Sequence, residues 1–142
     1  MIFTIGYQGK DIDSFVNVLK LNNIQELLDV RDTPISRKKG FSKRWLSEIL
    51  RNNGIEYIHV KELGDPKELR SKIQSKEISW EEFRQKFLRF LEQRIGIIQN
   101  IVNMNHTKNI CLMCFEANYK QCHRSLIAEV IEERFSERVT HL

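Results

Sequence analysis

The sequence predicts an α/β fold: a single domain over residues 1–142, with a mainly parallel, open sheet of about five strands and helices on both faces. Short apolar segments alternate with segments of helical periodicity, which is typical of strands joined by crossover helices. Residues 109–115 form a continuous apolar run, as expected for a strand that is covered on both faces.

The N-terminal segment is expected to form a strand, a turn and a helix. Residues 1–5 are apolar and favour a strand, and the glycines within residues 6–9 predict a turn. Asp11 or Asp13 can cap the helix that follows, which has an apolar face and ends near Leu21.

The next segment is expected to form two strands with a helix between them. Residues 26–31 predict a strand that ends on charged residues, and residues 55–60 alternate in polarity as a strand does. Between them, Ser42 can cap a helix that stops at Gly54. Trp45 lies on the apolar face of this helix, and we expect it in the core.

The longest helix is expected from Ser79 to about Met104. Ser79 and Glu82 have the spacing of a capping box at its start. Apolar and aromatic side chains recur along it every three or four residues, at Trp80, Phe83, Phe87, Phe90, Leu91, Ile98 and Ile101. We interpret this stripe as core and assign no cofactor to it.

The C-terminal segment is the most informative part of the chain. A short polar loop follows the strand at residues 109–115, and a helix is expected from Cys122 to about Phe135. Its first turn would contain Cys122, His123 and Arg124. The N-terminus of a helix favours negative charge, so this arrangement suits an anionic ligand or a thiolate.

Composition and charge narrow the class of protein. The net charge is +4, and the segment from Ser36 to Arg44 holds five basic residues and no acid. Such a basic loop favours an anionic partner, for example a nucleotide or a nucleic acid, although a solvated loop without a partner has the same composition.

We expect no membrane span and no signal peptide. Three cysteines do not indicate a disulfide framework, so we expect a cytoplasmic protein with reduced thiols.

Reactive and hydrogen-bonding side chains follow several of the expected strands. In an open parallel sheet, ligands bind at the edge where the carboxyl ends of the strands meet. With a last short strand at residues 139–142, the side chains expected at this edge are Tyr7, Gln8, Asp29, Arg31, Asp32, His59, Lys61, Cys114, Glu116 and His141.

Cys122 is the first candidate for a reactive group. A thiol beside a helix N-terminus and cationic side chains ionises readily, and the thiolate is the nucleophilic form. The imidazole of His123 could act as its acid or base. Each residue also has a structural alternative: Cys122 as a small core residue, His123 bonded to a nearby carbonyl, and Arg124 paired with Glu116 or Asp29.

Cys111 and Cys114 have the spacing of a zinc knuckle, for which Cys122 and His123 would be further ligands, but their place on a strand argues against a metal site. Residues three apart on a strand point to opposite faces, so the two thiols could not share an ion without a bend. We expect Cys111 in the core and no bound metal. Cys114 could face Cys122 across the loop, where a reversible disulfide is an open alternative.

Basic and aromatic residues near this edge are candidates for binding an anion. Arg31 could grip a phosphate, or it could pair with Asp29 as an internal ion pair. Tyr7, Phe41 and Tyr57 are candidates for stacking on a base. The residues predicted to bind a substrate or an anion are Tyr7, Arg31, Ser36, Lys43 and Arg124.

Five segments resemble the domain-of-unknown-function family 488 of bacterial and archaeal proteins, which includes YeaO-like sequences. They are TIGYQG at 4–9, LLDVRDTPIS at 27–36, Phe41-Ser42-Lys43, GIEYIHVKELG at 54–64 and CFEANYKQCHRSLIA at 114–128. The resemblance covers nearly the whole chain, and Cys111 lies outside the pattern. It implies a compact α/β domain but no particular reaction. It also implies motif positions at Tyr7, Asp29, Arg31, Pro34, Ser36, His59, Gly64, Cys114, Glu116, Cys122, His123 and Arg124.

Three functions are compatible with these residues. The first is a cysteine-dependent hydrolase or transferase that acts on a phosphate-bearing substrate such as a nucleotide or nucleic acid. Its catalytic residues would be Cys122 or Cys114 as nucleophile, His123 or His59 as acid or base, and Glu116 to orient them. The second is a non-catalytic nucleic-acid-binding module that uses the basic loop at residues 36–44. The third is a thiol redox or metal-sensing protein.

Overall fold

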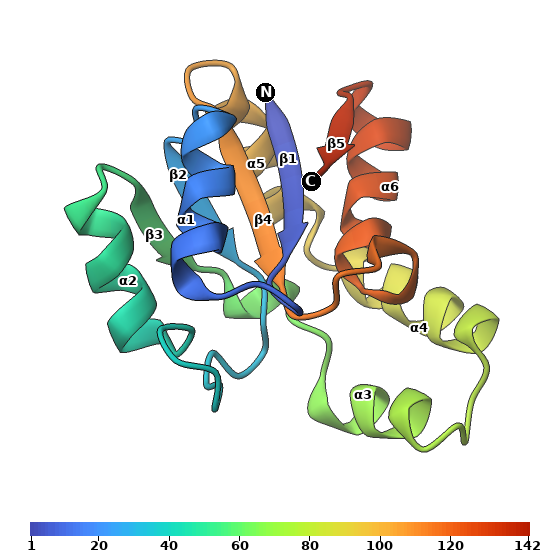
Figure 1. Cartoon of the computed structure of the whole chain (residues 1–142). Helices are drawn as coiled ribbons and strands as arrows, with labels where there is room; N and C mark the ends of the chain where they lie inside the picture. Colours follow the sequence, from blue (N-terminus) through green and yellow to red (C-terminus); the bar gives the residue numbers. More distant parts are fainter.

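Five parallel strands form the sheet in the computed structural model, which describes residues 1–142. Every pair of neighbouring strands is parallel, so all carboxyl ends lie along one edge, the lower edge in Figure 1. The strand order is β3-β2-β4-β1-β5, with β1 (Ile2–Gly6), β2 (Glu26–Asp29), β3 (Glu56–His59), β4 (Ile110–Cys114) and β5 (Val139–His141). The predicted fold class is confirmed.

Helices cover both faces of this sheet (Figure 1). The six helices are α1 (Ile12–Leu21), α2 (Lys43–Asn52), α3 (Lys67–Gln74), α4 (Trp80–Glu92), α5 (Ile95–Asn105) and α6 (Arg124–Phe135). α1 and α2 pack on one face, and α4, α5 and α6 pack on the other, while α3 lies beyond the carboxyl ends of the strands. None of the helices combines the length and apolar composition that crossing a membrane requires.

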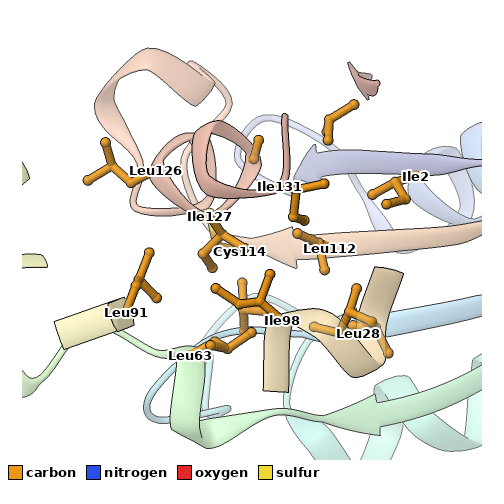
Figure 2. Packing of buried hydrophobic residues seen from close by; sticks show 14 of the residues in the cluster. Ile2, Leu28, Leu63, Leu91, Ile98, Leu112, Cys114, Leu126, Ile127 and Ile131 are labelled. Carbon is orange, nitrogen blue, oxygen red and sulfur yellow. The ribbon is translucent and has the colours of Figure 1, made fainter. Parts of the chain in front are cut away.

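The pleat of β4 separates two apolar layers. Cys111 points into the layer beneath α1 and α2, whereas Leu112 and Cys114 point into the layer beneath α4, α5 and α6. Figure 2 shows this second layer, in which Cys114 lies close to Leu112 and Ile127. Cys111 is fully buried, and this burial raises the pKa of its thiol. The predictions that Cys111 is a core residue and that it cannot meet Cys114 are confirmed.

The connection that follows β4 leads to the opposite face of the sheet from those that follow its neighbours β1 and β2. The connections after β1 and β2 lead to α1 and α2 on one face, whereas the connection after β4 leads to α6 on the other. β4 lies between β1 and β2 in the sheet, so connections diverge on both sides of its end. In open α/β sheets such a divergence leaves a crevice in which ligands bind.

The predicted long helix from Ser79 to Met104 is in fact two helices. Its start is as predicted, because the Ser79 side chain accepts a hydrogen bond from the backbone of Glu82 at 3.1 Å. The break between α4 and α5 lies at Arg94, whose guanidinium stacks over the Phe90 ring at 3.6 Å and donates to the Phe90 carbonyl at 3.1 Å. That carbonyl is the one that a continuous helix would bond to the backbone N–H of Arg94.

Two aromatic residues lie where the sequence did not predict them. Trp45, expected in the core, is 53% exposed, because the neighbouring Leu46 points into the core instead. Phe41, a predicted platform for a base, is fully buried between Tyr7 and Phe15, with ring centroids 4.5 and 5.1 Å away. The core position of Trp45 and the stacking role of Phe41 are therefore both wrong.

Gly6 lets the loop that follows β4 cross the end of β1. A Cβ at this position would overlap the backbone carbonyl of Glu116. We expect Gly6→Ala to lower the free energy of unfolding by about 2 kcal/mol or more, because the loop must move. Gly96→Ala is the matched control, since a Cβ there meets no atom within 4 Å. It should raise the stability by up to about 1 kcal/mol through helix propensity. Equal effects in urea unfolding would contradict the crossing.

Candidate functional site

A cleft opens at the carboxyl end of β4, between the edge of the sheet and α3. Its main cavity has a volume of about 310 Å³ and adjoins a smaller cavity of about 130 Å³. Both cavities are lined by Asp65, Arg70, Gln74, Glu116 and His123. The main cavity is also lined by Tyr7, Arg31, Asp32, Thr33, Ile35, Cys114 and Phe115. Five of the predicted site residues, namely Tyr7, Arg31, Cys114, Glu116 and His123, thus share one cleft.

Cys114, at the inner wall of this cleft, forms a disulfide with Cys122, so the expectation of reduced thiols is wrong for this pair. Cys114 is the last residue of β4 and lines the main cavity, while Cys122 does not line it. Each residue is only 1% exposed. The loop after β4 thus returns to the strand end and brings together two thiols that are eight residues apart.

The start of α6 differs slightly from the prediction. The helix begins at Arg124, with His123 as its N-cap residue, and Cys122 is still extended. The reason lies in the loop, where a short 3-10 helix (Tyr119–Gln121) ends at Cys122 and delays the α-helix by two residues. Cys122 therefore lies next to the N-cap rather than in the first turn.

The guanidinium of Arg124 is fully buried and has no carboxylate partner. It donates to Sγ of Cys114 at 3.2 Å, to Oγ1 of Thr4 at 3.1 Å, and to the backbone carbonyls of Glu116 and Ala117. Burial lowers its pKa, although the charge of Glu116 opposes this shift. Arg124 does not line the cleft. It contacts a cleft residue through its hydrogen bond to the sulfur of Cys114.

His123 has a defined orientation at the cleft wall. Its Nε2 lies 2.8 Å from the carbonyl oxygen of Val30, which can only accept a hydrogen bond. Nε2 therefore carries the proton of the neutral ring, and Nδ1 presents a lone pair. Nδ1 lies 3.7 Å from Sγ of Cys122 and 3.8 Å from Oδ1 of Asp65. The ring also packs edge-on against Phe87, with centroids 5.5 Å apart.

Asp29 and Arg31 form a buried ion pair at the end of β2. Nε and Nη2 of Arg31 donate to the two carboxylate oxygens at 2.8 and 2.7 Å. Asp29 also accepts from the hydroxyl of Tyr57 at 2.5 Å, and Nη1 of Arg31 donates to the hydroxyl of Tyr7 at 3.2 Å. Burial disfavours the charge of Arg31, but its bonds to Asp29 outweigh this and raise its pKa. Burial, together with the charge of Asp29, raises the pKa of Tyr57.

Two charged residues of the cleft, Asp65 and Arg70, were not among the predicted site residues. Nη1 of Arg70 lies 3.5 Å from Oδ1 of Asp65 and 3.8 Å from Oδ2 of Asp32. Gly64 allows this segment to approach β2, because a Cβ at Gly64 would overlap the backbone of Asp32. The Gly64-Asp65-Pro66 turn was the signal in the sequence that could have indicated these residues.

Similarity to known proteins is found at the level of a family. The chain matches the family described as Domain of unknown function DUF488 over residues 11–131. It belongs to this family. Comparisons with curated proteins and with solved structures gave no significant match. Of the cleft residues, Arg31, Cys114 and His123 lie within the matched part of the DUF488 domain, and Tyr7 precedes it.

Three further predicted residues lie outside the cleft of this DUF488 domain. Nε2 of His59 is 2.8 Å from the carbonyl oxygen of Arg31, so His59 is hydrogen-bonded to the backbone that follows β2 and does not line the cleft. Ser36 is bonded to the side chain of Ser42, and Lys43 is exposed at the start of α2. Both belong to the basic loop on the α1–α2 side of the sheet, which has a groove of its own.

The ion pair at the end of β2 can be tested by substitution. We expect Asp29→Asn to lower the free energy of unfolding by about 3–5 kcal/mol, because it leaves the buried guanidinium of Arg31 without a counter-charge. Tyr57→Phe removes only one hydrogen bond to the same carboxylate and should cost about 1 kcal/mol. Urea unfolding measures both variants. A loss in Asp29→Asn no larger than that in Tyr57→Phe would refute the role of the carboxylate.

Proposed function

We propose that this DUF488 domain is a thiol–disulfide oxidoreductase in which Cys114 and Cys122 cycle between dithiol and disulfide. The observation that carries the proposal is the buried guanidinium of Arg124, which donates to Sγ of Cys114 and has no carboxylate partner. In the reduced protein, a thiolate at Cys114 supplies the missing negative charge. A cation beside a thiol favours the reactive thiolate form.

The reaction proceeds in two exchanges. The thiolate of Cys114 attacks one sulfur of a substrate disulfide, whose S–S bond breaks, and the departing thiolate takes up a proton. Cys122 then loses its proton and attacks Sγ of Cys114, which releases the second half of the substrate as a thiol. The substrate disulfide is thereby reduced to two thiols, and the protein dithiol is oxidised to a disulfide. A dithiol reductant returns the protein to its starting state.

The neighbouring side chains have distinct tasks in these exchanges. Nδ1 of His123, 3.7 Å from Sγ of Cys122, accepts the proton of the resolving thiol. Cys114 lines the cavity and therefore makes the first attack, whereas Cys122 does not line the cavity and attacks Cys114 in the second step. Oε2 of Glu116 lies 3.5 Å from Sγ of Cys114 and can exchange a proton with it or with the leaving thiol.

The lining of the cleft favours a small zwitterionic disulfide such as cystine. The main cavity of about 310 Å³ is lined by acidic residues, including Asp65 and Glu116, and by basic residues, including Arg31 and Arg70. The ammonium groups of such a substrate would meet the carboxylates of Asp65 and Glu116. Its carboxylate would meet Arg70, whose distances to Asp65 and Asp32 are long, at 3.5 and 3.8 Å. The exposed ring of Phe115 adds an apolar contact beside the reactive sulfur.

A phosphate-bearing substrate, the first interpretation of the sequence, has less support from this geometry. Arg31 is already bound to Asp29, and Arg70 lies close to two aspartates. Arg124 does not line the cleft. The cleft therefore offers little unpaired positive charge, and a phosphate would meet three carboxylates among the lining residues.

The two exchanges predict different products for the two cysteine variants. When the reduced protein is mixed with cystine, Cys122→Ser should stop at a cysteine adduct on Cys114, because the resolving thiol is missing. Cys114→Ser should react at least about tenfold more slowly, because the thiol beside the guanidinium is gone. Peptide mass spectrometry after acid quenching identifies the modified residue.

Cys111→Ser is the control for this experiment and should form the internal disulfide like the wild type, since Cys111 lies on the other face of the sheet. The order of attack is refuted if the adduct in Cys122→Ser falls on Cys111. It is equally refuted if Cys114→Ser accumulates an adduct on Cys122 as fast as Cys122→Ser does on Cys114.

Binding of single-stranded nucleic acid is a second candidate function, favoured by the exposure of Trp45. A groove of about 470 Å³ on the α1–α2 side is lined by this ring together with Arg37, Lys38 and Lys39. The guanidinium of Arg44 lies 5.2 Å from the centre of the Trp45 ring. An exposed aromatic ring among cations is the arrangement that stacks on unpaired bases while binding the backbone.

This second function predicts a dependence on salt. Affinity for a single-stranded oligonucleotide should fall linearly on a log–log plot, and Lys39→Glu should reduce the slope by about 0.7 for the phosphate contact it removes. Trp45→Ala should weaken binding by about 1–3 kcal/mol without changing the slope. Lys86→Glu, with the same charge change on α4, is the control. A salt-independent affinity, or equal effects of the two lysine variants, would argue against binding in this groove.

A further inference from the structure

Three buried side chains at the inner wall of the cleft place potential metal ligands together. We infer that the dithiol form of the protein binds a zinc ion through Sγ of Cys114, Sγ of Cys122 and Nδ1 of His123. One ligand atom from each of these residues lies within 4.8 Å of the other two, and all three residues are buried. The inference rests on the dithiol state of the proposed function but adds a ligand to it.

The spacing of the ligand atoms suits tetrahedral coordination. Zinc binds sulfur at about 2.3 Å and imidazole nitrogen at about 2.0–2.1 Å, so two such ligands of one ion lie roughly 3.6 Å apart. Nδ1 of His123 and Sγ of Cys122 are separated by 3.7 Å. The Cα atoms of Cys114 and Cys122 are 7.6 Å apart, beyond the range of about 4.4–6.8 Å typical of disulfides. Once the disulfide is reduced, this backbone spacing allows the two sulfurs to move apart around an ion.

The imidazole of His123 is oriented as a metal ligand before any ion binds. A ligating histidine usually donates its second ring N–H to a carbonyl or carboxylate, which fixes the tautomer and aims the lone pair. Nε2 of His123 has this bond to the Val30 carbonyl, at 2.8 Å. The remaining lone pair on Nδ1 is directed towards Cys122 and Asp65.

The charges of the site fit a divalent ion with soft ligands. The two thiolates balance the charge of Zn²⁺, and the imidazole adds a neutral ligand. Thiolate ligands disfavour magnesium and calcium. The guanidinium of Arg124, 3.2 Å from Sγ of Cys114, supports the anionic form that coordinates. Three protein ligands leave a fourth position for water. Cys114 and His123 line the main cavity together with Glu116, so water from the cleft can reach this position.

Zinc and the disulfide exclude one another at this site. Because Cys114 is already a thiolate in the reduced protein, binding of Zn²⁺ releases one proton, from the thiol of Cys122, and leaves both sulfurs reduced. Oxidation of the pair removes two of the three ligands and must expel the ion. We therefore expect zinc to slow the reaction of the dithiol with cystine, and cystine to release zinc from the protein.

Cobalt binding tests the site through its spectrum rather than through activity. Reduced, metal-free wild-type protein titrated with Co²⁺ under argon should develop thiolate-to-cobalt charge-transfer absorption and the strong visible bands of a tetrahedral site. Zinc should then displace the cobalt with one equivalent. Cys122→Ser and His123→Ala should each weaken binding more than about 100-fold, since changes to residues that only hydrogen-bond to the ligands already cost 10–100-fold.

Cys111→Ser and His59→Ala are the controls, and both should bind cobalt like the wild type. Because His123→Ala removes a buried ring, its fold is checked by circular dichroism, and Cys122→Ser provides an isosteric second variant. The inference is overturned if the wild type shows no tetrahedral cobalt spectrum. It is also overturned if His123→Ala, with a native circular dichroism spectrum, binds cobalt as tightly as the wild type.

The same variants separate this inference from the proposed redox function. His123→Ala should still form the Cys114–Cys122 disulfide with cystine, although more slowly, while losing the metal. Absence of metal binding in a wild type that forms the disulfide refutes only the zinc site. Metal binding in a wild type that never forms the Cys114–Cys122 disulfide with cystine refutes only the redox function.

Discussion

The buried guanidinium of Arg124 joins the elements that meet at the carboxyl edge of the sheet. Arg124 is the first residue of α6, and its guanidinium donates hydrogen bonds to Thr4 of β1 and to Cys114 of β4. It also donates to two backbone carbonyl groups of the loop that follows β4. A cation without a carboxylate partner is costly to bury, so it must be offset by hydrogen bonds and by nearby negative charge. The sulfur of Cys114 is the group at the site that can change its charge to meet this need.

The cleft is assembled from connections rather than from strands. The loop after β4 crosses β1 at Gly6, and the segment after β3 crosses β2 at Gly64. His123 links the start of α6 to the end of β2 through the Val30 carbonyl. These crossings bring residues of three different connections around the end of β4. The geometry of the cleft therefore depends on backbone packing at two glycines that do not themselves line it.

The sequence was sufficient to predict the fold class, because apolar periodicity marks each strand and helix of a parallel sheet. The rule that ligands bind at carboxyl ends of strands also led to Arg31 and Cys114. Arg70 was missed because its position depends on how α3 packs beyond the sheet, which periodicity does not reveal. The contact between Cys114 and Cys122 could be expected only as one alternative, because it depends on the path of the returning loop rather than on the spacing of Cys111 and Cys114.

The position of Cys111 has a consequence for the covalent form of the chain. Three cysteines permit three intramolecular pairings, but the thickness of the sheet lies between Cys111 and the other two. Once β4 is paired with its neighbours, the disulfide cannot exchange to Cys111, because no other thiol lies on the α1–α2 side of the sheet. Repeated oxidation and reduction can therefore return the folded chain to one covalent isomer without the help of an isomerase.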